Sequence, residues 1–158
     1  MLAGWYIIGP AMVLPISLLL SYWMVAAYFM AVKRFAEFRD IGDPARAARY
    51  RRSFAFYTEP RLLISIMFYA SASMLFLGAF IMRYRLELIL SFPLVALVMA
   101  TYLALAFKAN SAAQAPEKLY REPILMGAVL LTAGVMITLL FVDIPIMYNV
   151  LAPTLPLP

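Results

Sequence analysis

Four long runs of apolar residues alternate with short polar segments along the chain. The runs cover residues 11–32, 62–82, 88–107 and 124–142, and none contains Asp, Glu, Lys or Arg. Each has about 20 residues, the length that an α-helix needs to cross the ~30 Å hydrocarbon core of a bilayer. The pattern predicts an all-α membrane protein with four transmembrane helices, in a single membrane domain spanning residues 1–158.

Prolines add detail to this pattern. We expect Pro10 and Pro15 inside the first helix and Pro93 inside the third, where neighbouring helices can satisfy the carbonyl groups that proline leaves free. Residues 143–158 hold four more prolines, Pro145, Pro153, Pro156 and Pro158. That composition predicts an irregular tail on the outer surface rather than a fifth span.

The polar segments differ strongly in charge. Residues 33–61 hold eight of the thirteen Lys and Arg residues, residues 83–87 hold two and residues 108–122 hold three. The first and third segments lie on the same side of a four-span protein, and positive charge accumulates on the cytoplasmic side. The count of eleven against two predicts N-out/C-out topology. We therefore expect an integral protein of a bacterial inner membrane, with its polar loop in the cytoplasm.

Composition supports the membrane interpretation and excludes several chemistries. The chain is 66% hydrophobic and 13% charged, whereas soluble domains are about 45–50% apolar and about 25% charged. The absence of Cys and His excludes thiolate–zinc sites, His-ligated haem and Ser-His-Asp triads, so we expect neither haem nor Zn. The net charge of +5 lies at the ends of the spans, which favours anionic lipid and not nucleic acid as its neighbour.

The segment 33–61 carries most of the available chemistry. Lys33 and Arg34 lie four and three residues before Glu37, so the three side chains share a face if the first helix continues past the bilayer. The sequence Ile-Gly-Asp-Pro at residues 41–44 then predicts a helix stop and a turn. Residues 45–56 predict a short amphipathic helix at the membrane surface; its basic stripe is Arg46, Arg49 and Arg52.

This charge pattern has two interpretations. The cations can be positive-inside anchors that reach lipid phosphates, while the acids neutralise part of their charge. Alternatively they form a pocket in which Arg and Lys bind a phosphate and Glu37 or Asp40 holds Mg²⁺. The charge pattern alone does not separate these interpretations.

A short motif precedes both the second and the fourth run. These are Tyr57-Thr58-Glu59-Pro60 and Tyr120-Arg121-Glu122-Pro123. Proline suits the first helical turn, and a carboxylate is favoured beside a helix N-terminus. The motif is typical of helices that enter a membrane from the cytoplasm, and a shared role facing the substrate is the alternative.

Three segments carry a family resemblance: Lys33-Arg34-x-x-Glu37, the Arg-rich stretch from Tyr50 to Thr58, and the loop from Ala115 to Pro123. Together with the four spans, they resemble the C-terminal half of UbiA-superfamily membrane transferases, nearest the decaprenyl-phosphate phosphoribosyltransferase branch. The resemblance implies that the four spans correspond to helices six through nine of a Mg²⁺-dependent enzyme acting on polyprenyl phosphates.

The resemblance also implies roles for individual residues. Lys33 and Arg34 would contact phosphate, and Glu37 would assist metal or ribose binding, with Asp40 a second Mg²⁺ candidate. The remaining candidates line or close the cytoplasmic mouth of the site: Arg51, Arg52, Tyr57, Arg121 and Glu122.

The chain departs from that family because nothing in it corresponds to helices one to five or to their Asp-rich motif. We therefore expect half of an active site, which needs a partner to act. The alternative is a non-catalytic subunit that stabilises a larger respiratory or photosynthetic type of membrane complex, through small residues that allow close helix contact; these are Ala70 to Ser73, Gly127, Ala128, Ala133 and Gly134. A carrier or channel is less favoured because the spans lack charged residues.

Overall fold

A computed structural model describes residues 15–42, 49, 56–108, 112–114 and 116–147. These residues form the α-helices α2 (Ile16–Ile41), α4 (Glu59–Tyr84), α5 (Phe92–Ala106) and α6 (Pro123–Phe141), and the 3₁₀ helices η2 (Leu86–Ser91), η3 (Ala112–Gln114) and η4 (Pro116–Arg121). The described residues include no strand. Four of their helical segments are long and apolar enough to cross a membrane, η2 and α5 forming one of them. The all-α expectation and its four membrane helices are confirmed at this level.

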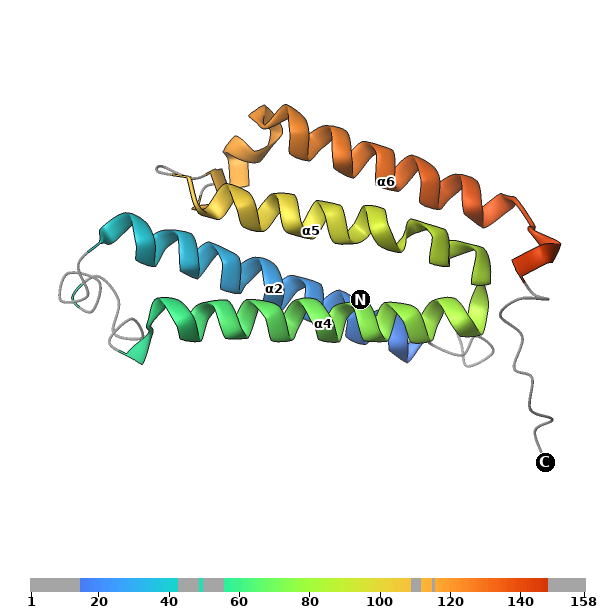
Figure 1. The fold of residues 1–158 in the computed structure, drawn as a ribbon, viewed down its shortest axis with the longest axis horizontal. Coiled ribbons are helices and arrows are strands. Elements are labelled where there is room, and N and C mark those ends of the chain that lie inside the picture. The colour runs from blue at the N-terminus through green and yellow to red at the C-terminus, as the bar shows by residue number, and fades with distance from the viewer. Residues whose placement is uncertain (1–14, 43–48, 50–55, 109–111, 115, 148–158) are drawn as a thin grey trace, which may run out of the picture.

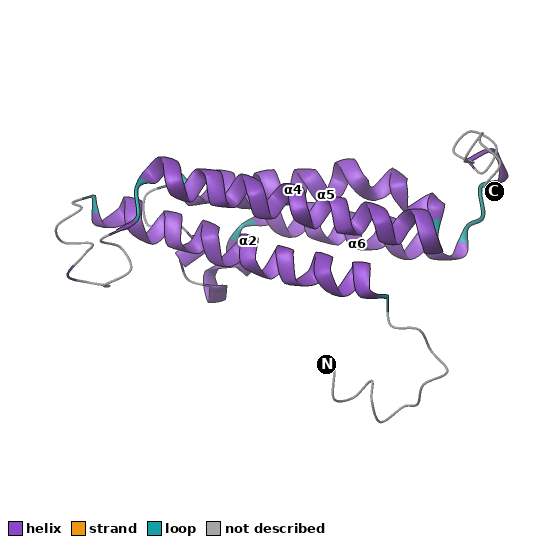
Figure 2. Cartoon of the chain, turned by 90° about the horizontal axis from the view of Figure 1, so that it is seen from below, coloured by secondary structure: helices purple, strands orange, loops and turns teal. Residues whose placement is uncertain are grey.

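The helices lie side by side and form an elongated bundle (Figures 1 and 2). α2 packs along α4 and also contacts α5, while α6 packs on α5. Figure 1 shows α5 between α6 and the α2–α4 pair. The end of α2, the start of α4 and the α5–α6 connection therefore lie at one end of the bundle, and η2 and the end of α6 lie at the other.

The start of the first helix differs from the expectation, whereas its end agrees with it. Pro15 lies at the N-cap, where its carbonyl accepts from the Leu19 N–H at 3.1 Å, so it is not inside the helix as predicted. A proline at the start of a helix costs nothing because its missing N–H would have no helical partner there. α2 continues beyond residue 32 to Ile41, and Gly42 ends it with a left-handed φ of 68°, as the stop signal predicted.

The third span also differs from the expectation, because Pro93 begins α5 rather than interrupting it. The proline ring would clash with the carbonyl four residues earlier in a continuous α-helix. The preceding residues form η2 instead, and the Phe92 N–H donates to the Ile89 carbonyl. The Ser91 hydroxyl donates to the Leu88 carbonyl at 2.6 Å. The span is therefore a 3₁₀ segment followed by an α-helix.

Two apolar clusters hold the bundle together. The larger joins α2, α4, α5, η3 and α6 around Val32, Phe35 and Ile66, whose side chains are fully buried. The smaller lies at the opposite end around Ile81, Leu88 and Leu139. In the most apolar 18-residue stretch of each span, however, only 17–28% is buried inside the protein. The remaining apolar surface suits contact with the lipid bilayer.

Several expectations concern residues outside the described part of the chain. Residues 43–48 and 50–55, which include most of the amphipathic helix predicted at 45–56, are among them. So are Pro10, the first four residues of the run 11–32, and residues 148–158 of the tail.

Candidate functional site

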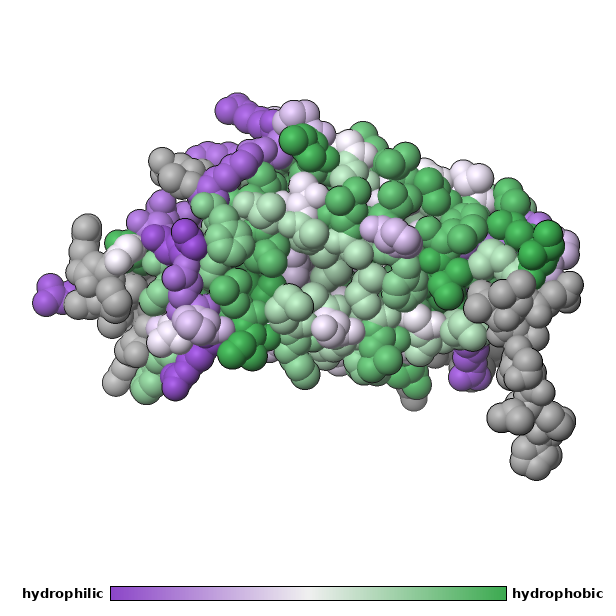
Figure 3. Space-filling view, in the orientation of Figure 1, coloured by the Kyte–Doolittle hydropathy of each residue, from purple (hydrophilic) through white to green (hydrophobic). Residues whose placement is uncertain are grey.

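Most of the charge of the chain lies at one end of the bundle. Figure 3 shows a band of hydrophilic residues there, where α2 stops and α4 starts. In the sequence, residues 33–61 and 108–122 contain eleven Lys and Arg and six Asp and Glu, a surplus of five. Residues 83–87 and Asp143 contain two of each sign. We call these the basic end and the neutral end.

Arg34 and Glu37 form an ion pair at the basic end. Their side chains lie one turn apart on α2, with Arg34 Nη1 and Glu37 Oε2 3.0 Å apart. Both are largely shielded, with side-chain exposures of 25% and 16%, because the same turns of α2 pack against the larger apolar cluster through Phe35 and Ala36. The helical face predicted from the sequence therefore exists, and the pair holds the guanidinium in a defined place.

Arg39 contacts three elements at this end. It donates to Glu59 at 2.7 Å, at the first turn of α4. Its guanidinium also lies over the rings of Phe35 and Phe107, 5.7 Å and 5.0 Å from their centroids. Sequence reasoning did not select Arg39, although its position four residues after Phe35 indicates stacking on one helix face. Arg39 thus connects α2 to the start of α4 and the end of α5.

The α5–α6 connection folds back against α2. Ala113 in η3 is buried in the larger apolar cluster, and Gln114 Nε2 donates to the Ala36 carbonyl at 3.3 Å. The bonded carbonyl lies in the turn of α2 that carries Arg34 and Glu37. Ala36 lies within the Lys33–Glu37 segment of the family resemblance, and Gln114 directly precedes the loop at residues 115–123 that carries another part of it.

The two Tyr-x-Glu-Pro motifs, at residues 57–60 and 120–123, cap their helices differently. Thr58 caps α4 by accepting from the Arg61 N–H at 3.4 Å, whereas Glu122 caps α6 with no side-chain bond to the helix. In each case the glutamate forms an ion pair with a cation at the end of the preceding span, Arg39 with Glu59 and Lys108 with Glu122 at 3.5 Å. The motif therefore fastens the ends of consecutive helices together.

The other candidate residues are more dispersed. Lys33 is partly buried on α2, and Asp40 and Tyr57 are exposed. Arg121 is exposed in η4, where its Nε donates to the Tyr120 hydroxyl at 3.2 Å and its guanidinium lies over that ring. Arg51 and Arg52 lie outside the described residues.

The predicted Mg²⁺ ligands fit the ion only as part of a larger site. Glu37 and Asp40 are three residues apart on α2 and so share a face. One or two carboxylates, together with substrate phosphate and water, can hold Mg²⁺, but Arg34 already engages Glu37. In the described part of the chain, no three acids lie close enough to hold a metal. Mg²⁺ binding therefore stays a prediction that requires further ligands.

A second charged cluster, at the neutral end, was not expected from the sequence. Arg85 donates to Asp143 at 2.8 Å and to the carbonyls of Leu139 and Leu140 at the end of α6. Glu87 beside it is fully buried, and its carboxylate accepts from the Ile144 N–H at 3.4 Å. These contacts fasten the α4–α5 turn to the end of α6.

No protein-family model, curated protein or solved structure matches this chain. Arguments about function therefore start from the chemistry of the two ends.

Proposed function

We propose that the chain is half of a UbiA-like membrane transferase that acts on polyprenyl phosphate substrates, with a partner supplying the Asp-rich half. The observation that supports this most is the docking of η3 on α2. It fixes Gln114 on the α2 turn that carries the Lys-Arg-x-x-Glu segment. The loop at residues 115–123, which carries another part of the resemblance, begins at the next residue of the chain. In a transferase, segments distant in sequence must meet around one substrate phosphate.

The chemistry of the basic end suits this role. A guanidinium presents its donors in a planar fork that matches phosphate oxygens, and Glu37 holds the Arg34 fork in place through one of its nitrogens. The remaining Arg34 donors and the Lys33 ammonium are then available to a phosphate. Glu37 and Asp40 would contribute to Mg²⁺ binding beside acids of the partner, and the ion would neutralise charge on the departing phosphate.

The proposal places the basic end in the cytoplasm of a bacterial inner membrane. The support is the charge asymmetry of the sequence: the polar segments 33–61 and 108–122 carry its whole surplus of five positive charges, and such a surplus retains segments on the cytoplasmic side. Anionic lipid headgroups on that side would surround the same residues.

An activity measurement tests the transferase function. The chain is reconstituted together with a membrane protein that carries the Asp-rich motif of the family, and transfer to or from a polyprenyl phosphate is followed. We expect the chain alone to be inactive and the pair to be active. Glu37→Gln and Arg34→Ala should each lower the rate by at least about tenfold, while Arg83→Gln at the neutral end should not. Unchanged activity in the first two variants would rule the catalytic role out.

A second candidate is a non-catalytic subunit of a larger membrane complex. It is favoured by the open face of α6, where a Cβ added at Gly127 or Gly134 would meet no atom within 4 Å. Glycines on an exposed helix face let another helix approach closely. Purification of the chain within a stable complex that shows no polyprenyl transfer would support this function over the first.

A further inference from the structure

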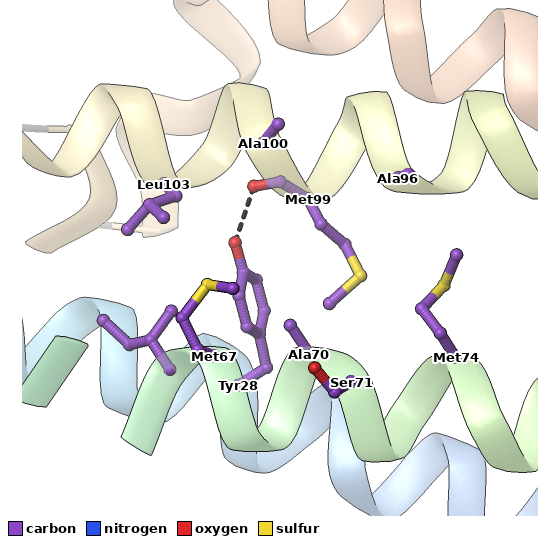
Figure 4. Close-up of a pocket in the computed structure, with 10 residues that line it drawn as sticks. Tyr28, Met67, Ala70, Ser71, Met74, Ala96, Met99, Ala100 and Leu103 are labelled. Atoms are coloured by element: carbon purple, nitrogen blue, oxygen red, sulfur yellow. Dashed lines mark hydrogen bonds between the residues drawn. The ribbon is translucent and has the colours of Figure 1, made fainter. Parts of the chain in front are cut away.

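An apolar groove of about 360 Å³ lies between α4 and α5 (Figure 4). Its walls carry short side chains, Ala70 and Ser71 on α4 and Ala96 and Ala100 on α5, and Tyr28 of α2 also lines it. Ser71, Ala96 and Ala100 are exposed, so the groove opens at the surface of the bundle. Because it lies within the membrane-spanning part of the helices, it opens to the bilayer.

The groove exists because α2 holds its two walls apart. The Ser21 hydroxyl donates to the Ser73 carbonyl of α4 at 3.0 Å. The Tyr28 hydroxyl donates to the Met99 carbonyl of α5 at 2.6 Å (Figure 4). α4 and α5 themselves are joined chiefly through η2 at the neutral end. The Tyr28 hydroxyl is already bonded, so the space favours an apolar occupant.

The dimensions suit one alkyl chain. A volume of 360 Å³ equals about 12 units of the ~30 Å³ that a water molecule occupies, and a methylene group is of similar size. A helix, about 10 Å across with its side chains, would not fit. On α5 the lining residues run from Ala96 to Leu103, a rise of about 10 Å at 1.5 Å per residue, so the groove is shorter than one leaflet of the ~30 Å hydrocarbon core.

One end of the groove leads to Arg39. Leu103 lines the groove, and Phe107 lies one turn further along the same face. The Arg39 guanidinium is 5.0 Å from the centroid of the Phe107 ring and is paired with Glu59 on the opposite wall. A polar pocket of about 230 Å³, lined by Arg39, Glu59 and Gly42, adjoins this pair. Arg39 therefore lies about one turn of α5 beyond the end of the groove at Leu103, where the headgroup of an occupant that extends past the groove would meet it.

We propose that the groove binds an acyl chain of an acidic phospholipid from the bilayer, with the phosphate at Arg39. Glu59 accepts from one donor of the Arg39 fork, and the phosphate would bind through others of its five N–H groups. Among the described residues, the same end carries eight Lys and Arg against five Asp and Glu, which selects an anionic headgroup. This lipid is a resident of the bilayer and not a substrate, so the proposal does not depend on the transferase function.

Native mass spectrometry tests the proposal. The purified full chain is reconstituted in vesicles of equal phosphatidylglycerol and phosphatidylcholine and extracted in detergent, and the retained lipids are counted. We expect one retained lipid per chain, with phosphatidylglycerol preferred. Ala100→Phe should abolish retention of both lipids because the ring fills the groove. Arg39→Gln should keep a lipid but lower the preference about fivefold, the effect of one cation near a headgroup.

Matched variants complete the test. Leu97→Phe enlarges an exposed side chain on the same helix outside the groove, and Arg83→Gln removes a cation at the neutral end; both should retain lipid like the unaltered chain. Ala96→Met fills the groove less severely and serves if Ala100→Phe does not fold. Unchanged retention in the groove variants, or unchanged preference in Arg39→Gln, would overturn the proposal. So would a dimer of the chain with no lipid bound.

Discussion

Arg39 and Arg85 show how differently the two ends of the bundle use the same side chain. The Arg85 guanidinium donates hydrogen bonds to Asp143 and to two backbone carbonyls at the end of α6, beside the fully buried Glu87. Arg39 makes one ion pair with Glu59, and both side chains are more than a third exposed. At the neutral end the charges balance and hold helices together, whereas the basic end has a surplus of cations. The neutral end therefore stabilises the packing of the helices, and the proposals assign phosphate binding to the basic end.

The largest effect should appear in the sidedness of the two ends. The chain has no cysteine, so Lys118→Cys at the basic end and Pro145→Cys at the neutral end can be labelled singly. We expect a membrane-impermeant maleimide applied from outside the cytoplasm to label Pro145→Cys and to leave Lys118→Cys unmodified, because the positive end stays in the cytoplasm. The reverse pattern would show that the charge asymmetry does not set the topology.

Loss of the cation at the neutral end should be costly. Arg85→Ala removes the guanidinium that lies beside the fully buried Glu87 carboxylate. Removing one member of a buried charged pair costs about 3–5 kcal/mol. We expect about 3 kcal/mol less unfolding free energy in detergent titrations, since Glu87 keeps the Ile144 N–H as a donor. Asp143→Asn provides the control, because Asp143 is 74% exposed, and should change stability little. A loss below about 1 kcal/mol for Arg85→Ala would contradict a structural role for this cluster.

The same substitution at the basic end should cost much less. Arg39→Ala removes an ion pair with exposures of 40% and 46%, and such pairs contribute about 0–1 kcal/mol. Allowing for the lost stacking on Phe107, we expect the unfolding free energy to fall by no more than about 1 kcal/mol, measured in the same titration. If Arg39→Ala and Arg85→Ala prove equally destabilising, the functional contrast between the two ends is wrong.

The sequence predicts the local features of this fold well. Runs without charge predicted the spans, and the Ile-Gly-Asp-Pro sequence at residues 41–44 predicted the end of α2, since both signals act within a few residues. The Arg34–Glu37 pair follows from helical spacing for the same reason. Pro15 and Pro93 were misplaced because a proline inside an apolar run can equally begin a helix.

The features that depend on distant contacts were not predictable. Arg39 meets Glu59, 20 positions later in the chain, and Arg85 meets Asp143, 58 positions later; neither spacing carries a periodic signal. The groove between α4 and α5 depends on two hydrogen bonds from α2, one of them from Tyr28 to a residue 71 positions away. Helical spacing cannot specify which faces of the spans meet, so the candidate site was predicted as a list of residues rather than as an arrangement.

Binding of a polyprenyl phosphate tests the central claim most directly, namely that the basic end receives phosphate and the neutral end does not. The dissociation constant is measured for the full chain in nanodiscs and for two variants, Arg34→Gln and Arg83→Gln. Removing a cation near the headgroup should weaken binding about fivefold, so we expect that loss for Arg34→Gln and no change for Arg83→Gln. Equal constants for both variants and the unaltered chain would contradict the account.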